Sequence, residues 1–293
     1  LIPDPTSGEV FVKMRTHPSF ATATDGWEFR PIAEFHATQD KDKFEFDIDE
    51  PKGRIPVLAG ASFNIWNPDF GAPYAYGEPE VIRGALSNKL ARAASSDRSA
   101  YSGLHFSSEQ LPMDRPRIAF RDVARATDTR TTLACLLPPG VVFTHKAPII
   151  VRRKGDAKAE AFLLGVLSSI PFDWYMRRWV EATFSFELLS QAPIPRGELQ
   201  GQRSQRVIQI SGALAALDSR YAEWADEVGV QTGSVADDLA KSDLIAELDA
   251  LVSLLYGLSA EQVEHVFATF HRGWDYRSRL DSVLAHYKNW KGG

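Results

Sequence analysis

The 293-residue chain lacks most of the features that mark a secreted, membrane or zinc-binding protein. Its one cysteine, Cys135, has no partner for a disulfide, and the seven histidines show no zinc-like spacing. No apolar run approaches the roughly 18 residues that a membrane-spanning helix requires. No signal peptide is visible at the start. We therefore expect a cytoplasmic protein that does not bind a membrane.

A recognisable catalytic site is also missing. Asn67-Pro68-Asp69-Phe70 is close to the Asn-Pro-Pro-Tyr motif of amino-methyltransferases, but the second proline is replaced and no Gly-rich loop for S-adenosylmethionine precedes it. Glu50-Pro51-Lys52 has the letters of a nuclease ExK motif, which works with further acids around a divalent metal. The Pro68-Asp69 pair follows this motif instead of preceding it. We therefore expect no catalytic residue, metal ion or cofactor in this chain.

Positive charge is concentrated between residues 115 and 154, although the whole chain carries a net charge of −5. This basic segment has nine Lys and Arg residues and only two acids, Asp122 and Asp128, so its net charge is +7. The run RDVARATDTRTT combines arginines with short hydroxyl side chains, a mixture suited to phosphates and base edges. We interpret the segment as an anion-binding surface. The alternative is a set of surface arginines that only pair with acids.

The order of the patterns predicts a mixed α/β domain over residues 1–198 and an α-helical module over residues 199–293. In the first part, Glu9–Met14 has a strand-like pattern and Pro79 is well placed to begin a helix. Thr131–Leu137 is expected to form a short helix. The chain begins at Leu1 and not at Met, so we expect it to be a piece of a longer polypeptide.

The second part has helical periodicity throughout. Between residues 207 and 228 apolar side chains recur with heptad spacing, which predicts one helix that packs against a partner. Gly257 is placed to end a second helix, and Ser259 with Gln262 forms a capping box that starts a third. Residues 201–271 contain four cations and eleven acids, so this module is not expected to lie on a polyanion.

Several stretches resemble the C-terminal region of large Eco57I-like class I DNA methyltransferases and type IIG restriction–modification proteins. They are GASFNIWNPDFGAPYAYGEPE, RIAFRDVARATDTRTTLACLLPPGVVFTHKAPII, LLGVLSSIPFDWYMRRWVEATFSFELLSQAPIPR and DLIAELDALVSLLYGLSAEQVEHVF. Together they cover most of residues 55–270 in the family's order. In that family this region is the target-recognition domain, while a separate N-terminal domain binds S-adenosylmethionine and carries the Asn-Pro-Pro-Tyr site.

The resemblance implies sequence-specific recognition of double-stranded DNA on behalf of an adenine-specific methyltransferase or restriction–modification enzyme, with a role in phage defence. The expected partners are DNA and the N-terminal methyltransferase domain of the same polypeptide, which would bind S-adenosylmethionine. We expect the DNA contacts to come from the basic segment, through Arg117, Arg121, Arg125, Thr127, Thr129, Arg130, Lys146, Arg152 and Arg153. Two alternatives stay open: a self-contained metal-dependent nuclease, and an interaction scaffold of a defence complex that docks through the heptad face.

Overall fold

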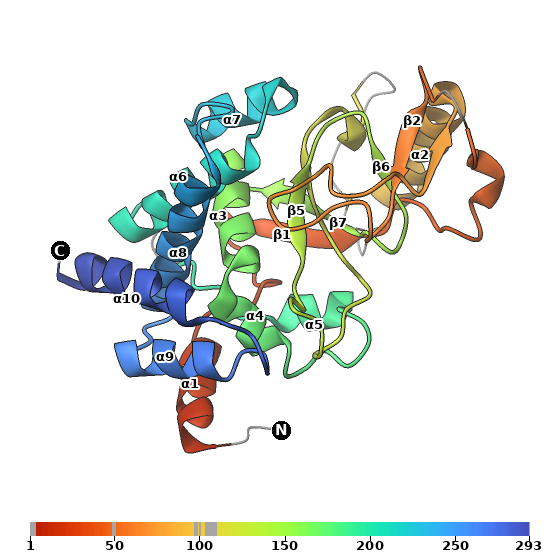
Figure 1. Ribbon diagram of the computed structural model, residues 1–293. Coiled ribbons are helices and arrows are strands. Elements are labelled where there is room, and N and C mark those ends of the chain that lie inside the picture. The colour runs from red at the N-terminus through yellow and green to blue at the C-terminus, as the bar shows by residue number, and fades with distance from the viewer. Residues whose placement is uncertain are drawn as a thin grey trace. The chain divides into compact units, whose positions relative to one another are not determined.

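The computed structural model describes residues 4–48, 51–96, 99, 101–102, 110–197 and 199–292. The chain forms two compact units (Figure 1). The helical unit contains residues 1–22, 124–132 and 156–293, and the sheet unit contains residues 23–123 and 133–155. Each unit is therefore assembled from separate segments, and the chain passes from one unit to the other four times.

The sheet unit holds all the strands among the described residues. Its elements are β1 (Glu28–Ile32), β2 (Ile55–Leu58), β3 (Ala75–Gly77), α2 (Pro79–Ala94), β4 (Arg117–Phe120), β5 (Ala134–Leu137), β6 (Val142–Phe143) and β7 (Ile149–Lys154), with short 3-10 turns at Lys41–Lys43 and Pro112–Asp114. In the described part of the chain, one sheet has the order β1-β7-β4-β5 and is antiparallel, and the other has the order β3-β2-β6 with β2 and β6 parallel.

Apolar side chains from both sheets and from α2 form one core in this unit. Strands β4 and β5 are buried along their whole length, and they pair so that Ala119 lies opposite Cys135. Leu86 and Leu90 of α2 belong to the same cluster. Pro31 cannot donate a ladder hydrogen bond, which fits the place of β1 at the edge of its sheet.

The helical unit contains the remaining helices. They are α1 (Pro5–Arg15), α3 (Ala157–Ser168), α4 (Ile170–Met176), α5 (Phe186–Gln191), α6 (Gln202–Ala215), α7 (Ala222–Val228), α8 (Asp238–Leu255), α9 (Ala260–Ala268) and α10 (Arg277–Gly292), with a 3-10 turn at Ser219–Tyr221. Helix α3 is buried on nearly all sides and packs on α6, which in turn packs on α8 (Figure 1). A helix without a polar face is typical of a core position.

The contact between α3 and α6 depends on Gly165. A Cβ atom added there would lie 2.2 Å from Ser211 Oγ and 3.0 Å from Val207 Cγ1. Gly165→Ala is therefore expected to lower the free energy of unfolding by about 1–3 kcal/mol, because the helices must separate. Gly84→Ala, at an exposed position of α2, is the matched control. Nothing lies within 4 Å of its added Cβ, and it should stabilise the protein by about 0.5–1 kcal/mol. Denaturant unfolding measures both changes, and equal effects at the two sites would contradict this view of the packing.

Three predictions of local structure are wrong. Glu9–Met14 lies in α1, because Asp4 caps the helix by accepting a hydrogen bond from Ser7 N and Pro5 begins it. The predicted short helix over Thr131–Leu137 is instead strand β5, and before it the backbone N–H groups of Thr131 and Thr132 donate to the carboxylate of Asp173. The heptad segment is broken after Ala215, since Asp218 caps a new turn by accepting from Arg220 N.

Other local predictions are confirmed. Helix α2 begins at Pro79, α8 is followed by Gly257 in a left-handed conformation, and Ser259 and Gln262 form a capping box. The fold class is also confirmed, since a mixed α/β part is followed by a helical module. The contacts do not divide the chain at residue 198, however, because α3 packs on α6 and α4 packs on α8.

Candidate nucleic-acid interface

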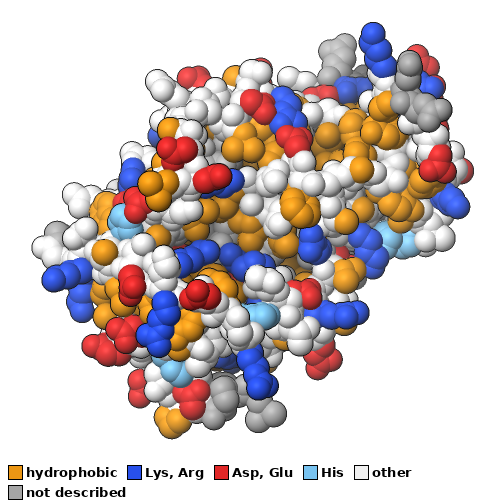
Figure 2. Space-filling model, viewed as in Figure 1, with side chains coloured by type: hydrophobic (Ala, Val, Ile, Leu, Met, Phe, Trp, Pro, Cys, Tyr) orange, Lys and Arg blue, Asp and Glu red, His pale blue; other side chains and the backbone are white. Residues whose placement is uncertain are grey.

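The residues predicted to bind DNA are divided between the two units. Arg125, Thr127, Thr129 and Arg130 belong to the helical unit, within the segment 124–132 that we call the arginine loop. The other predicted residues, Arg117, Arg121, Lys146, Arg152 and Arg153, belong to the sheet unit. The basic segment is continuous in sequence, but its cations belong to two different units. Over the helical unit, Figure 2 shows acidic side chains lying among the basic ones.

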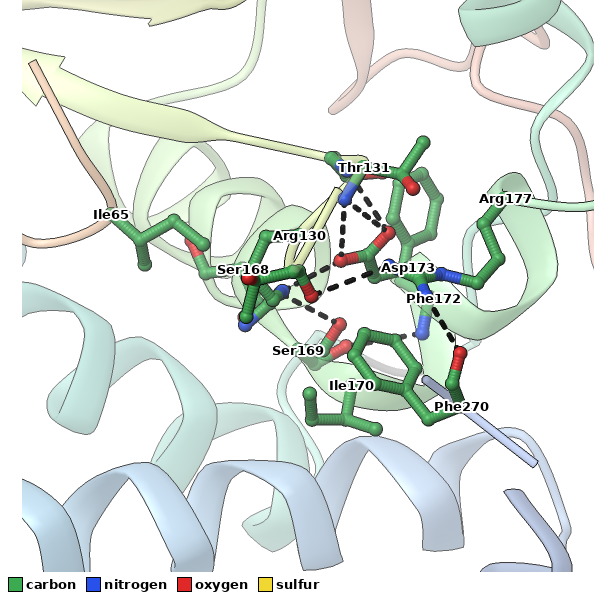
Figure 3. A network of polar contacts seen from close by, with 12 residues as sticks. Ile65, Arg130, Thr131, Ser168, Ser169, Ile170, Phe172, Asp173, Arg177 and Phe270 are labelled. Carbon is green, nitrogen blue, oxygen red and sulfur yellow. Dashed lines mark hydrogen bonds and ion pairs between the residues drawn. The ribbon is translucent and has the colours of Figure 1, made fainter. Parts of the chain in front are cut away.

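The arginine loop is held from its C-terminal end by Asp173, which lies in the first turn of α4. This carboxylate is fully buried and accepts hydrogen bonds from Thr132 N at 2.9 Å and from Thr131 N at 3.2 Å (Figure 3). Arg130 Nε donates to the same carboxylate at 2.6 Å, and its terminal nitrogen donates to Ser168 O at 2.7 Å. Arg130 therefore ties the loop to the junction of α3 and α4.

The local sequence explains why Asp173 is available. Helix α3 stops at Ser168, and Ser169 becomes the N-cap of α4 by accepting a hydrogen bond from Phe172 N. Pro171 in the first turn is compatible with a helix start because that position needs no intrahelical hydrogen bond. The break leaves a new helix N-terminus, where a carboxylate is favoured by the helix dipole.

Arg177 is a second anchor of the arginine loop. Its terminal nitrogens donate to Phe270 O at 2.6 Å, to Asp128 O at 2.9 Å and to Thr129 O at 3.3 Å. The guanidinium also lies 4.1 Å from the centre of the Phe270 ring. Burial is the main effect that lowers the pKa of Arg177 below the ordinary value of an arginine. His271 Nε2 lies 3.1 Å from Thr127 O, so the loop backbone is held at several points.

The other face of the arginine loop is open to solvent. Arg125, Thr127 and Thr129 are exposed, whereas the Arg130 side chain is only 16% exposed and Thr131 is buried. Asp128 closes a tight turn, since Arg125 N donates to its carboxylate at 2.9 Å and Asp128 N donates to Arg125 O at 3.0 Å. Within the described residues no hydrogen bond or ion pair engages the Arg125 guanidinium. The loop thus presents one arginine and two hydroxyls outward from a fixed backbone.

The cations of the sheet unit have different environments. Arg117 is 6% exposed and pairs with the buried carboxylate of Glu34, so its guanidinium is directed into the core and not to the surface. Arg153 pairs with Glu28 at 2.9 Å. Arg121 donates to Gly60 O at 2.8 Å and is half-exposed.

Two further cations of the sheet unit reach solvent. Lys146 is exposed, with Asp122 at 3.3 Å, and Arg152 is half-exposed. Surface ion pairs of this kind contribute about 0–1 kcal/mol each, so they are easily exchanged for another anion. Lys146 is therefore more accessible to an external anion than Arg117, which is buried and stabilises the fold through its pairing with Glu34.

Sequence reasoning missed Asp173 and Arg177, which organise the loop. They lie more than 40 residues from the groups they hold, and no periodicity links them to the arginine loop. Among the described residues no group of three or more His, Cys, Asp or Glu side chains could hold a metal ion. Glu50 of the ExK-like motif lies outside the described residues.

Comparison with known proteins finds similarity to solved structures. No protein-family model matches the chain. A search of curated proteins finds no match. Eight chains of solved structures match. One is the type IIL restriction–modification enzyme MmeI in complex with DNA, with a TM-score of 0.39 and 12% sequence identity over 94% of this chain. This chain spans 37% of that structure's length.

No helix in the described part of the chain is both long and apolar enough to cross a membrane.

Proposed function

We propose that this chain recognises double-stranded DNA in a sequence-specific manner, as the target-recognition part of a DNA methyltransferase or restriction–modification enzyme. The observation that carries the proposal is the arginine loop, which holds Arg125, Thr127 and Thr129 outward on a backbone fixed by Asp173 and Arg177. A reading group must keep its geometry before DNA arrives, because disorder would add an entropic cost to binding.

The chemistry of the exposed residues suits the DNA surface. An arginine can donate two parallel hydrogen bonds to guanine O6 and N7, and hydroxyls donate to phosphates or base edges. The resemblance in sequence to target-recognition regions supports the same role, since the arginine loop lies inside one of the two longest similar stretches. In this proposal Arg125 meets the bases or backbone with Thr127 and Thr129.

The remaining predicted contacts are divided by their environment. Arg121, Lys146 and Arg152 of the sheet unit are proposed to contact phosphates, because Lys146 is exposed and Arg121 and Arg152 are partly exposed. Arg130 is proposed to position the loop through Asp173, and Arg117 and Arg153 to stabilise the sheet unit through their carboxylate partners. This division differs from the sequence prediction, which gave all of them a direct contact with DNA.

The wider assignment also rests on the resemblance. We propose that the chain works with an N-terminal methyltransferase domain of the same polypeptide, which binds S-adenosylmethionine and modifies adenine. The parent enzyme would act in a restriction–modification or phage-defence system. None of the residues discussed above is proposed to contact that cofactor.

A binding experiment with the 293-residue chain tests the proposal. Affinity for a mixed-sequence duplex should fall steeply with salt, because each phosphate contact releases counterions. Arg125→Ala is expected to weaken binding to the preferred duplex by about 1–3 kcal/mol if it contacts a base, or to reduce the salt slope by about one if it contacts a phosphate. Arg220→Ala, an exposed arginine in the acidic module, is the control and should change neither quantity. Failure of the wild type to bind any duplex at low salt would contradict the proposal.

A further inference from the structure

Two histidines of the sheet unit lie face to face. The rings of His36 and His145 have centroids 4.0 Å apart and planes within 2° of parallel. The backbone places them there, because Phe35 N donates to Phe143 O at 3.0 Å and Phe35 forms a parallel bridge with Thr144. The stack therefore follows from the pairing of two chain segments that are far apart in sequence.

Hydrogen bonds from the backbone determine which ring nitrogen carries the proton. His145 Nδ1 accepts from Ala37 N at 3.2 Å, and His36 Nδ1 accepts from Thr38 N at 3.3 Å. A neutral imidazole whose Nδ1 is an acceptor carries its hydrogen on Nε2. Burial, followed by the neighbouring His36 and Lys146, lowers the pKa of His145 and so keeps that ring neutral at neutral pH.

The same tautomer indicates the kind of ligand. A histidine that binds a metal through Nε2 uses the lone pair of that atom and donates a hydrogen bond from the other nitrogen. Here the roles are reversed, so each Nε2 is a donor. Both rings are half-buried, and no described residue accepts a hydrogen bond from either Nε2. The pair can therefore offer two N–H groups to a ligand with two acceptors.

The spacing of the rings matches that of stacked bases. Successive bases on a DNA strand are about 3.4 Å apart and nearly parallel. Every purine presents N7 as an acceptor in the major groove, and guanine adds O6. We propose that His36 and His145 read two successive purines by donating from Nε2 to their N7 atoms. This inference rests on the proposed function, and it names specificity-determining residues that the basic segment alone does not reveal.

The surroundings of the pair are compatible with DNA. Lys146 follows His145 directly and is exposed, and Asp122 N donates to Lys146 O at 3.2 Å. A Cβ added at Gly60 would meet both Arg121 and Lys146 O at 2.9 Å, so Arg121 lies close to the same backbone. Cations beside two N–H donors give a phosphate contact next to a base contact. A phosphate at the rings themselves would favour the imidazolium, which the backbone donors to Nδ1 oppose.

Enrichment of duplexes from a randomised pool tests this inference. Wild type should select a motif that contains two adjacent purines. His36→Ala and His145→Ala should each lose roughly two- to tenfold of the preference at one of these positions and keep it elsewhere. His145→Gln keeps an N–H donor and should retain part of the preference. His286→Ala is the matched control, because His286 lies on α10 and its Nε2 is 2.9 Å from Asp243.

Replacing the two purines by their 7-deaza analogues tests the atom directly. Wild type should lose the same two- to tenfold, and the alanine variants should lose nothing further. Unchanged selection by folded His36→Ala and His145→Ala, or a uniform loss of affinity for all sequences, would overturn the inference and leave the proposed function standing. If wild type binds no duplex, the proposed function and this inference both fail.

Discussion

Replacing Asp173 with alanine should lower the free energy of unfolding by about 3–5 kcal/mol, because the change leaves the mostly buried Arg130 without its counter-ion. The carboxylate is fully buried, holds Arg130 at 2.6 Å and receives the backbone N–H groups of Thr131 and Thr132. Its loss strands all three donors. Denaturant unfolding measures the change, provided that the dependence of the unfolding free energy on denaturant concentration is the same in both proteins.

Two further variants separate charge from shape. Asp173→Asn keeps an acceptor for one backbone N–H and should cost less than alanine. Asp122→Ala removes a surface carboxylate whose partner Lys146 is exposed, and it should stay within about 1 kcal/mol of wild type. If the arginine loop contacts DNA, Asp173→Asn should also weaken duplex binding while the protein stays folded. Equal stability losses for Asp173→Ala and Asp122→Ala would show that the buried network does not hold the loop.

Arg117→Ala is expected to have a similarly large effect in the sheet unit, about 3–5 kcal/mol of unfolding free energy. Arg117 pairs with the buried carboxylate of Glu34, donates to Val141 O and lies 4.8 Å from the centre of the Phe143 ring. Removing it leaves Glu34 buried without a cation. The double variant Arg117→Met with Glu34→Gln should cost less than the two single changes together. Arg115→Ala, an exposed neighbour, is the control.

The Arg117 variant should also change how stability depends on pH. Burial raises the pKa of Glu34, and Arg117 opposes that rise. Without Arg117 the pKa of Glu34 in the native state rises further. Glu34 then stays protonated over a wider pH range above the ordinary glutamate pKa of about 4.3. Stability then falls as pH rises through that range, because the unfolded state binds fewer protons than the native state. The deficit relative to wild type should be larger near about pH 8 than near about pH 5. An equal deficit at both would contradict an ionised Glu34–Arg117 pair.

Local signals in the sequence predicted the helix ends well. Pro79, Gly257 and the Ser259 capping box act through neighbouring residues, so their effect is visible in the sequence. The heptad pattern identified side chains that are buried, such as Val207 and Trp224, but not the break between α6 and α7. These side chains pack within the helical unit and do not form an exposed docking face. Residues 9–14 have a strand-like alternation, but they form part of helix α1 because Asp4 caps its N-terminus.

Only part of the candidate site could be predicted from the sequence, for a physical reason. Composition shows where arginines are, and it points to the loop that carries Arg125. It cannot show which arginines are neutralised by acids elsewhere, and Arg130 and Arg117 have such partners 43 and 83 residues away. Likewise the stack of His36 on His145 depends on a strand pairing that no local pattern encodes.

The arginine loop leaves the sheet unit after β4 and returns to it before β5, although its own contacts are in the helical unit. No single cut in the chain separates the two units. A new specificity could not be transplanted by joining two proteins at one junction. An exchange would have to replace residues 23–123 and 133–155 together and keep the intervening loop with the helices that hold it. Under the proposed function, DNA preference should therefore change more readily by point substitution at the exposed positions than by exchange of whole segments.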